Sequence, residues 1–212
     1  MALHRCGSLL AVIVVCLFAG GAQAVNLLVD SGFEAGPVNT LPPPWANVGM
    51  GPSWLPMVEG NAATMYGSLS LQHVSWTGTA DEGFVYQQVS VAPGLPMDAS
   101  ITIRAHSGGA ESGVHHFHGV GIDPTGGTDW NGANVVKYVL NGQKNIHPNW
   151  ITISVNGVVA QSNTVTYFIY SYMDTANGGW WAHMYDNAVL TPEPSALALL
   201  GLAGLPLLRR RR

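Results

Sequence analysis

The sequence predicts an all-β protein with a single β-sandwich domain, and three observations favour this fold class. Short segments rich in Val, Ile, Thr and aromatic residues recur along the chain, and clusters of Gly, Pro, Asn and Asp separate them. Outside the two ends of the chain, no long window carries the apolar stripe of a helix, which repeats about every 3.6 residues. The strand-like segments are short and regularly spaced, as is typical of a sandwich.

The expected strands follow one another from residue 69 to residue 190. A Pro-rich stretch at 42–44, followed by Trp45, predicts a loop before them. Asn156 and Gly157 lie between two alternating runs and predict a two-residue hairpin turn, because a type I′ turn requires positive φ at both central residues. In chain order, the expected strands cover residues 69–76, 84–91, 100–105, 114–122, 134–140, 150–155, 158–161, 164–173 and 183–190.

The N-terminus has the three parts of a secretory signal peptide. His4 and Arg5 form a short basic region, residues 9–19 are apolar, and residues 22–24 form a small-x-small cleavage site. We therefore expect export by the Sec machinery, with Val25 as the first residue of the mature protein.

The C-terminus has a second targeting pattern. Pro192, Glu193 and Pro194 are followed by an uncharged apolar run at 195–208 and by four arginines at 209–212. The run is shorter than the roughly 20 residues that span a bilayer core, and basic residues are typical of a cytoplasmic flank.

These three parts, in this order, resemble the PEP-CTERM sorting signal of bacteria that make extracellular polysaccharide. The resemblance implies a transient membrane anchor, recognition by an exosortase-type processing enzyme and cleavage near Pro192, Glu193 and Pro194. An ordinary C-terminal tail anchor is the alternative. We thus expect a signal peptide over 1–24, one β-sandwich domain over 25–191 and a sorting and anchor segment, with a short apolar helix, over 192–212.

The charge of the expected mature domain excludes nucleic-acid binding. Between residues 25 and 191, Arg104, Lys137 and Lys144 are the only Lys or Arg residues, and acidic residues outnumber them. Nucleic-acid binding requires Lys and Arg to displace the counterions of the phosphates. Both cysteines, Cys6 and Cys16, lie in the expected signal peptide, so we expect neither a disulfide nor a thiolate metal ligand in the mature domain.

Three short motifs resemble the jelly-roll, galactose-binding type of carbohydrate-binding module. They are N-L-L-V-D-S-G-F-E at 26–34, V-Y-Q-Q-V-S-V at 85–91 and M-Y-D-N-A-V-L at 184–190. The resemblance implies that the first and last strands are neighbours, and that Glu34 and Asp186 bind a structural calcium ion there. Carboxylate and carbonyl oxygens are the ligands that Ca²⁺ prefers. The alternative is that both carboxylates only cap strand ends.

The tryptophans suggest where a sugar would bind. The chain has seven, and an indole can stack on the apolar C–H face of a sugar while Asp and Asn hydrogen-bond to its hydroxyls. Trp130, between Asp129 and Asn131, fits this pattern, as do Trp180 and Trp181 after a Gly-rich turn. The alternative is that each tryptophan fills the core, as large aromatic residues often do.

Four histidines lie close together in the sequence. Two of them, His116 and His118, share one face of a strand. Imidazoles bind Zn and Cu, but the sequence specifies no third ligand. Because Val120 and Ile122 share the same face, the pair would point into the core unless a bulge at Gly119 intervenes. The commoner outcome for such a cluster, however, is surface or rim histidines without a ligand. The four residues are His106, His115, His116 and His118.

We therefore expect an exported, non-enzymatic protein, secreted or at the cell surface, that binds carbohydrate in the extracellular polysaccharide matrix. A structural matrix or surface protein without specific sugar binding is one alternative. A divergent glycoside hydrolase or lyase is another, but no motif fixes the pair of carboxylates that glycoside hydrolysis uses. The chain also has no Gly-x-Ser-x-Gly elbow of an α/β-hydrolase.

Overall fold

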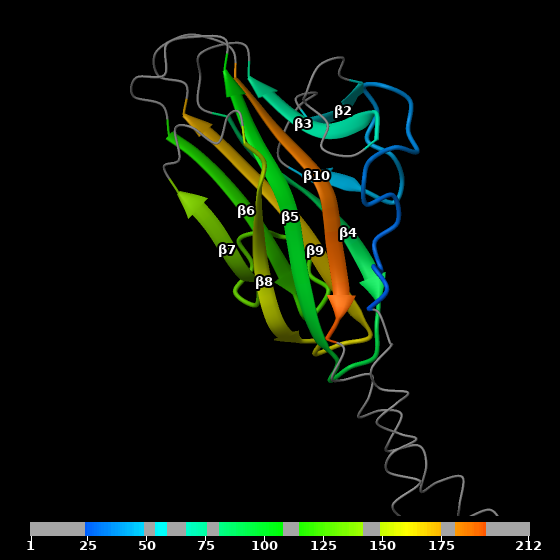
Figure 1. The fold of residues 1–212 in the computed structure, drawn as a ribbon. Coiled ribbons are helices and arrows are strands. Elements are labelled where there is room, and N and C mark those ends of the chain that lie inside the picture. The colour runs from blue at the N-terminus through cyan, green and yellow to red at the C-terminus, as the bar shows by residue number, and fades with distance from the viewer. Residues whose placement is uncertain are drawn as a thin grey trace, which may run out of the picture.

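The computed structural model describes residues 24–48, 54–58, 67–75, 81–107, 115–141, 149–174 and 181–193. These residues form two five-stranded antiparallel sheets packed face to face (Figure 1). Sheet A has the order β1-β4-β9-β6-β7, and sheet B has the order β2-β3-β10-β5-β8. The described residues include no helix, so the predicted all-β sandwich is confirmed.

The strands alternate between the two sheets along much of the chain. Sheet A consists of β1 (Ala46–Val48), β4 (Asp81–Ser90), β9 (Thr164–Asp174), β6 (His115–Asp123) and β7 (Val136–Asn141). Sheet B consists of β2 (Trp54–Val58), β3 (Leu69–Ser75), β10 (Trp181–Pro192), β5 (Pro96–Ser107) and β8 (Ile151–Val159).

Two strands were not predicted, and both lie at sheet edges. The strand β1 has three residues and forms one edge of sheet A. The strand β2 contains Pro56 and forms one edge of sheet B. Proline lacks an N–H donor and is therefore confined largely to edge strands, which explains why this segment does not read as a strand from its sequence.

The predicted hairpin at Asn156 and Gly157 is wrong, because both residues lie inside the continuous strand β8. The pairing of β5 with β8 shifts there: Met97 pairs with Val158, whereas Ala99 pairs with Val155. Two residues of β8 thus face one residue of β5, which is a β-bulge. Gly157 has φ of 69°, and its N–H donates to Asp98 Oδ1 at 2.9 Å. A type I′ turn requires positive φ at both central residues, whereas here only Gly157 has positive φ. The Asn-Gly pair therefore forms a bulge within a strand and not a hairpin turn.

The core lies between the sheets and consists of the inward-facing residues of both. Buried and exposed side chains alternate along the edge strand β8, as expected for strands, whereas both faces of β5, β9 and β10 are buried over much of their length. Tyr167 crosses the core from β9, and its hydroxyl donates to the Ser100 carbonyl on β5 at 2.7 Å. Trp45 closes one edge by packing against Phe33 and Tyr167. Burying each such side chain contributes about 1.5–3 kcal/mol.

The N-terminal segment lies along β10, as predicted for neighbouring ends of the domain. The Leu27 N–H donates to the Leu190 carbonyl at 2.8 Å, and the Ala188 N–H donates to the Ser31 carbonyl at 2.9 Å. Asn26 adds side-chain hydrogen bonds to the backbone of β10. This segment is not a strand, but it occupies the place expected for the first one.

Both expected targeting segments fall largely outside the described residues. The residues of these segments outside the described ranges are 1–23, which are all of the expected signal peptide except Ala24, and 194–212, which are Pro194 and the apolar and basic run that follows it. Pro192 is the last residue of β10, and the Glu193 N–H donates to the Pro96 carbonyl at 3.0 Å. Within the described part of the chain, no helix is long and apolar enough to cross a membrane.

Candidate functional site

The outer face of sheet A carries a row of aromatic side chains. Tyr86 from β4, Tyr170 and Tyr172 from β9, and Phe117 from β6 point away from the core and are half-buried. We call these four residues the aromatic face. They come together because strand pairing places Tyr172 opposite Phe117 and Phe168 opposite Tyr86. Phe168 is fully buried beneath them.

Tyr170 is held in place from two sides. Its ring stacks on Trp130, with centroids 4.8 Å apart and planes 6° from parallel. Its hydroxyl donates to Glu82 Oε1 at 2.9 Å. Partial burial, and then the Glu82 carboxylate, raise the pKa of Tyr170 well above its usual value, so the hydroxyl stays protonated and remains a hydrogen-bond donor.

The expectation of an exposed indole at Trp130 is wrong, because only 2% of the residue is exposed. The ring packs onto Gly119 and Gly121 of β6, where an added Cβ would lie 2.8 Å from ring atoms of Trp130. Lys137 Nζ lies 4.7 Å from the ring centroid and donates to the Trp130 carbonyl at 3.0 Å. Trp130 therefore supports the aromatic face from the side and does not present a stacking surface of its own.

The residues predicted to accompany the tryptophans have local roles or are not described. Asp129 and Asn131 are exposed, and Asp129 Oδ1 accepts the Asn131 N–H at 2.9 Å within the turn that carries Trp130. Trp180 lies outside the described residues. Trp181 begins β10, and its side chain is not among those described.

The two predicted calcium ligands lie near one another at the N-terminal segment. A Cβ on Gly32 would be 3.8 Å from Glu34 Cγ and 4.0 Å from Asp186 Oδ1. Glu34 Oε1 accepts the N–H groups of Ser68 and Leu69 at 2.8 and 2.9 Å. Asp186 Oδ1 accepts the Asn187 N–H at 2.6 Å.

The adjacent Asp30 supplies a further oxygen. Its Oδ1 accepts the Glu34 and Ala35 N–H groups, whereas its buried Oδ2 has no hydrogen-bond partner within the described ranges. A buried carboxylate oxygen without a donor fits a cation. Nevertheless, the described residues contain no group of three or more His, Cys, Asp or Glu side chains arranged to hold a metal ion.

A second polar group lies inside the sandwich and was only partly predicted. His116 and His118 point into the core and are fully buried, as the face they share with Val120 and Ile122 indicates, and they are not the surface or rim histidines that are commoner in such a cluster. Both rings pack against His183 of β10, which comes from the opposite sheet, and His183 in turn packs against His73 of β3. The sequence did not indicate that His73 and His183 belong to this group, because each lies in an ordinary strand pattern. Only the packing of the two sheets brings them close to the histidines of β6.

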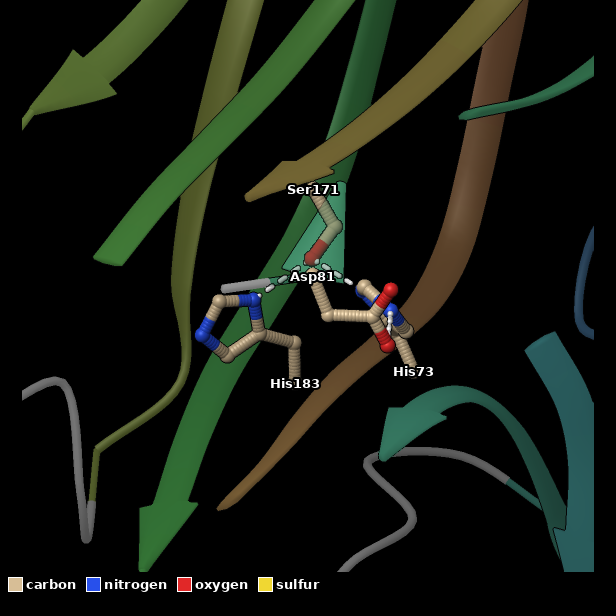
Figure 2. Close-up of polar contacts among 4 residues, drawn as sticks. All are labelled: His73, Asp81, Ser171 and His183. Atoms are coloured by element: carbon tan, nitrogen blue, oxygen red, sulfur yellow. Dashed lines mark hydrogen bonds and ion pairs between the residues drawn. The ribbon is translucent and has the colours of Figure 1, made fainter. Parts of the chain in front are cut away.

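Ser171 of β9 joins the histidines of sheet B (Figure 2). Its Oγ lies 2.8 Å from His73 Nδ1 and 2.7 Å from His183 Nδ1. His73 Nε2 lies 3.1 Å from Asp81 Oδ2 in the one ion pair among the described residues. On the other side, His183 Nε2 lies 2.5 Å from His116 Nδ1. This chain of contacts links the two sheets through the core.

The contacts of Ser171, His73 and Asp81 have the composition of a catalytic triad but not its accessibility. Ser171 and His73 are fully buried, so no substrate reaches the hydroxyl. The arrangement instead places a group of imidazoles inside the core. Burial, followed by the neighbouring histidines, lowers the pKa of His183 well below its usual value and that of His118 to about 3.

Comparisons with known proteins identify the class of fold. No family model matches the chain, and no curated protein matches it. Among solved structures, the carbohydrate-binding module TmCBM61 in complex with β-1,4-galactotriose has a TM-score of 0.58 at 14% identity, over 80% of this chain and 99% of that chain. The K3 adhesin domain of Lys-gingipain from Porphyromonas gingivalis has a TM-score of 0.52 at 15% identity, over 80% and 99% of the two chains.

A third similar structure belongs to an enzyme. An arabinose-bound GH51 α-L-arabinofuranosidase has a TM-score of 0.55 at 17% identity, over 82% of this chain but only 27% of the enzyme chain. At these identities the likeness concerns the fold alone. The described residues thus form a two-sheet β-sandwich of the kind seen in carbohydrate-binding modules.

Proposed function

We propose that the protein binds carbohydrate, without catalysis, through the aromatic face of sheet A. The observation that carries this proposal is the row of half-buried rings Tyr86, Phe117, Tyr170 and Tyr172 on the outside of one sheet. Aromatic residues that stay partly exposed on a strand face offer flat apolar surfaces, on which the C–H face of a sugar can stack. The likeness to TmCBM61, solved with a galactotriose, supports the class of ligand.

Polar groups at the rim of the aromatic face suit sugar hydroxyls. Glu82 and Gln88 are exposed and lie on the same side of β4 as Tyr86. Gln88 Nε2 donates to the Gly126 carbonyl at 2.7 Å, which leaves the amide oxygen as an acceptor for a ligand. Rings flanked by fixed polar groups are the usual composition of a small-ligand site.

We also propose that a calcium ion stabilises the end of the sandwich near Gly32. Asp30, Glu34 and Asp186 would hold it, since the buried Oδ2 of Asp30 has no partner among the described residues, and Glu34 Cγ and Asp186 Oδ1 lie 3.8 and 4.0 Å from the position of a Cβ on Gly32. Oxygen ligands of this kind suit Ca²⁺. The ion would be structural, because it would tie the N-terminal segment to β10.

The proposed setting is extracellular. We propose that the signal peptide at 1–24 directs export, and that an exosortase-type enzyme recognises Pro192, Glu193 and Pro194 and releases the transient anchor behind them. Carbohydrate binding would then keep the protein in the polysaccharide matrix.

Affinity electrophoresis in gels cast with different polysaccharides tests the carbohydrate proposal. Replacing Tyr86 or Tyr172 with Ala should weaken binding at least about tenfold, because aromatic anchors at a binding surface carry most of its energy. Tyr138→Ala is the matched control, since Tyr138 is 46% exposed on β7 and lies outside the aromatic face. Equal binding by all three variants would contradict the proposal, and release of reducing ends would favour a hydrolase instead.

A further inference from the structure

One exposed carboxylate borders the aromatic face of sheet A. Glu82 is exposed on β4, and strand pairing places it opposite Tyr172, which in turn lies opposite Phe117. Residues that lie directly opposite one another on neighbouring strands project on the same side of the sheet. The carboxylate and the two rings therefore form one row across β4, β9 and β6, and a sugar that stacks on these rings lies beside the carboxylate.

Tyr170 holds this carboxylate by one oxygen. The Tyr170 hydroxyl donates to Glu82 Oε1 at 2.9 Å, and the Tyr170 ring is in turn stacked on Trp130. In the described part of the chain, no further hydrogen bond or ion pair engages the Glu82 carboxylate. Fixing a side chain before binding reduces the freedom that it loses when a ligand arrives. Glu82 Oε2 is therefore an ordered acceptor at the edge of the aromatic face.

No lysine or arginine in the described strands of sheet A lies close enough to neutralise Glu82. Lys137 is the only such residue in these strands. It pairs with Gly121, four residues along β6 from the row that contains Glu82, and β7 is three strands from β4. With about 4.8 Å between strands and about 3.4 Å per residue, the two positions are about 20 Å apart in the sheet. The Debye length at physiological ionic strength is only about 8 Å, so Lys137 does not offset the charge that Glu82 presents to a ligand.

We propose that Glu82 makes the aromatic face selective for neutral glycans over acidic ones. A carboxylate accepts hydrogen bonds and the hydroxyls of a neutral sugar donate them, so the two form a charge-assisted hydrogen bond. A uronate or sulfate group in the same place has no proton to donate and carries a like charge, which weakens binding. This selectivity rests on the proposed carbohydrate binding by the aromatic face and names the class of sugar that the face takes.

Calorimetric titration of the purified protein with matched pairs of oligosaccharides tests this selectivity. The neutral members are 1,4-linked galactan, glucan and mannan oligosaccharides, and the acidic members are the same sugars after oxidation of their C6 alcohols to carboxylates. The wild type should bind a neutral sugar at least about tenfold more tightly than its oxidised form, as expected for a like charge a few ångström away. Added salt should reduce this preference, because ions screen exposed charges.

Glu82→Gln should remove most of the preference for the neutral sugar and its dependence on salt, because the charge is lost. The amide oxygen can still accept the Tyr170 hydroxyl, so the Tm of the variant should stay close to that of the wild type. Asp129→Asn is the matched control. It removes an equal charge at an exposed position in the turn that carries Trp130, and it should keep the preference of the wild type.

The outcomes separate this selectivity from carbohydrate binding itself. Equal binding of neutral and oxidised sugars by the wild type would overturn the selectivity and leave the aromatic face as a binding site. A Glu82→Gln protein that keeps the full preference would do the same. Tyr172→Ala should weaken the binding of both forms alike, because it removes a ring and not a charge. Binding of none of these sugars by the wild type would overturn the selectivity together with the proposed function.

Discussion

At the scale of single residues, Trp130 shows how burial changes the meaning of a sequence pattern. A tryptophan between Asp129 and Asn131 is typical of an exposed loop, yet its ring packs onto Gly119 and Gly121 and stacks on Tyr170. Two glycines on one face of β6 leave a flat surface that accepts the indole. The two glycines at alternate positions in the sequence could have indicated that a ring packs on this face of β6. That the ring belongs to Trp130, however, depends on how the loop after β6 folds back.

Trp130→Ala should destabilise the protein by about 3–5 kcal/mol, as for other buried tryptophans. It should also weaken glycan binding, because Tyr170 would lose the ring that supports it. Urea unfolding measures the first effect and affinity electrophoresis the second. Tyr138→Ala, at an exposed position, should change the unfolding free energy by no more than about 0.5 kcal/mol. A Trp130→Ala protein with unchanged unfolding free energy would show that the indole is not packed as described.

At the scale of strands, the alternation of apolar residues predicted most elements but not their partners. Residues 164–173 were expected as a strand and are observed in β9, because β-branched and aromatic residues dominate there. The aromatic face, however, requires that β4, β9 and β6 be neighbours, and pairing between distant segments leaves no local pattern. The β-bulge at Gly157 likewise depends on Asp98 of β5.

The buried histidines that join the strands should make stability depend on pH. The folded-state pKa values of His118 and His183 lie below the unfolded value of 6.5, so the unfolded chain binds more protons than the folded protein between about pH 3 and 6.5. Stability should therefore be fully present above pH 6.5 and fall on acidification, by up to about 1.4 kcal/mol per pH unit for each histidine.

Thermal unfolding between pH 7.5 and 4.5 measures this effect. His118→Asn, which removes one imidazole and its contact with the Tyr185 hydroxyl at 3.1 Å, should lower stability at pH 7.5 but flatten its pH dependence. An unchanged slope in this variant would show that His118 does not remain neutral in the folded protein.

At the scale of the whole molecule, the N-terminal segment and β10 close the sandwich, and the proposed calcium ion would strengthen that closure. If Asp30, Glu34 and Asp186 hold calcium, a chelator should lower the Tm, because an ion that binds only the folded state stabilises it by about 2.7 kcal/mol at a hundredfold excess over Kd. Asp30→Asn should remove most of the calcium-dependent increase in Tm. Differential scanning calorimetry with calcium and with a chelator gives this comparison, and identical Tm values for the wild type would contradict the site.

Whether the aromatic face binds carbohydrate is tested most directly by hydroxyl-radical footprinting of the protein with and without a bound polysaccharide. Oxidation of Tyr86, Phe117 and Tyr172 should fall on binding, whereas oxidation of Tyr138 on β7 should be unchanged. Protection of Tyr138 alone, or unchanged oxidation of the aromatic face while the polysaccharide is bound, would contradict carbohydrate binding at this face.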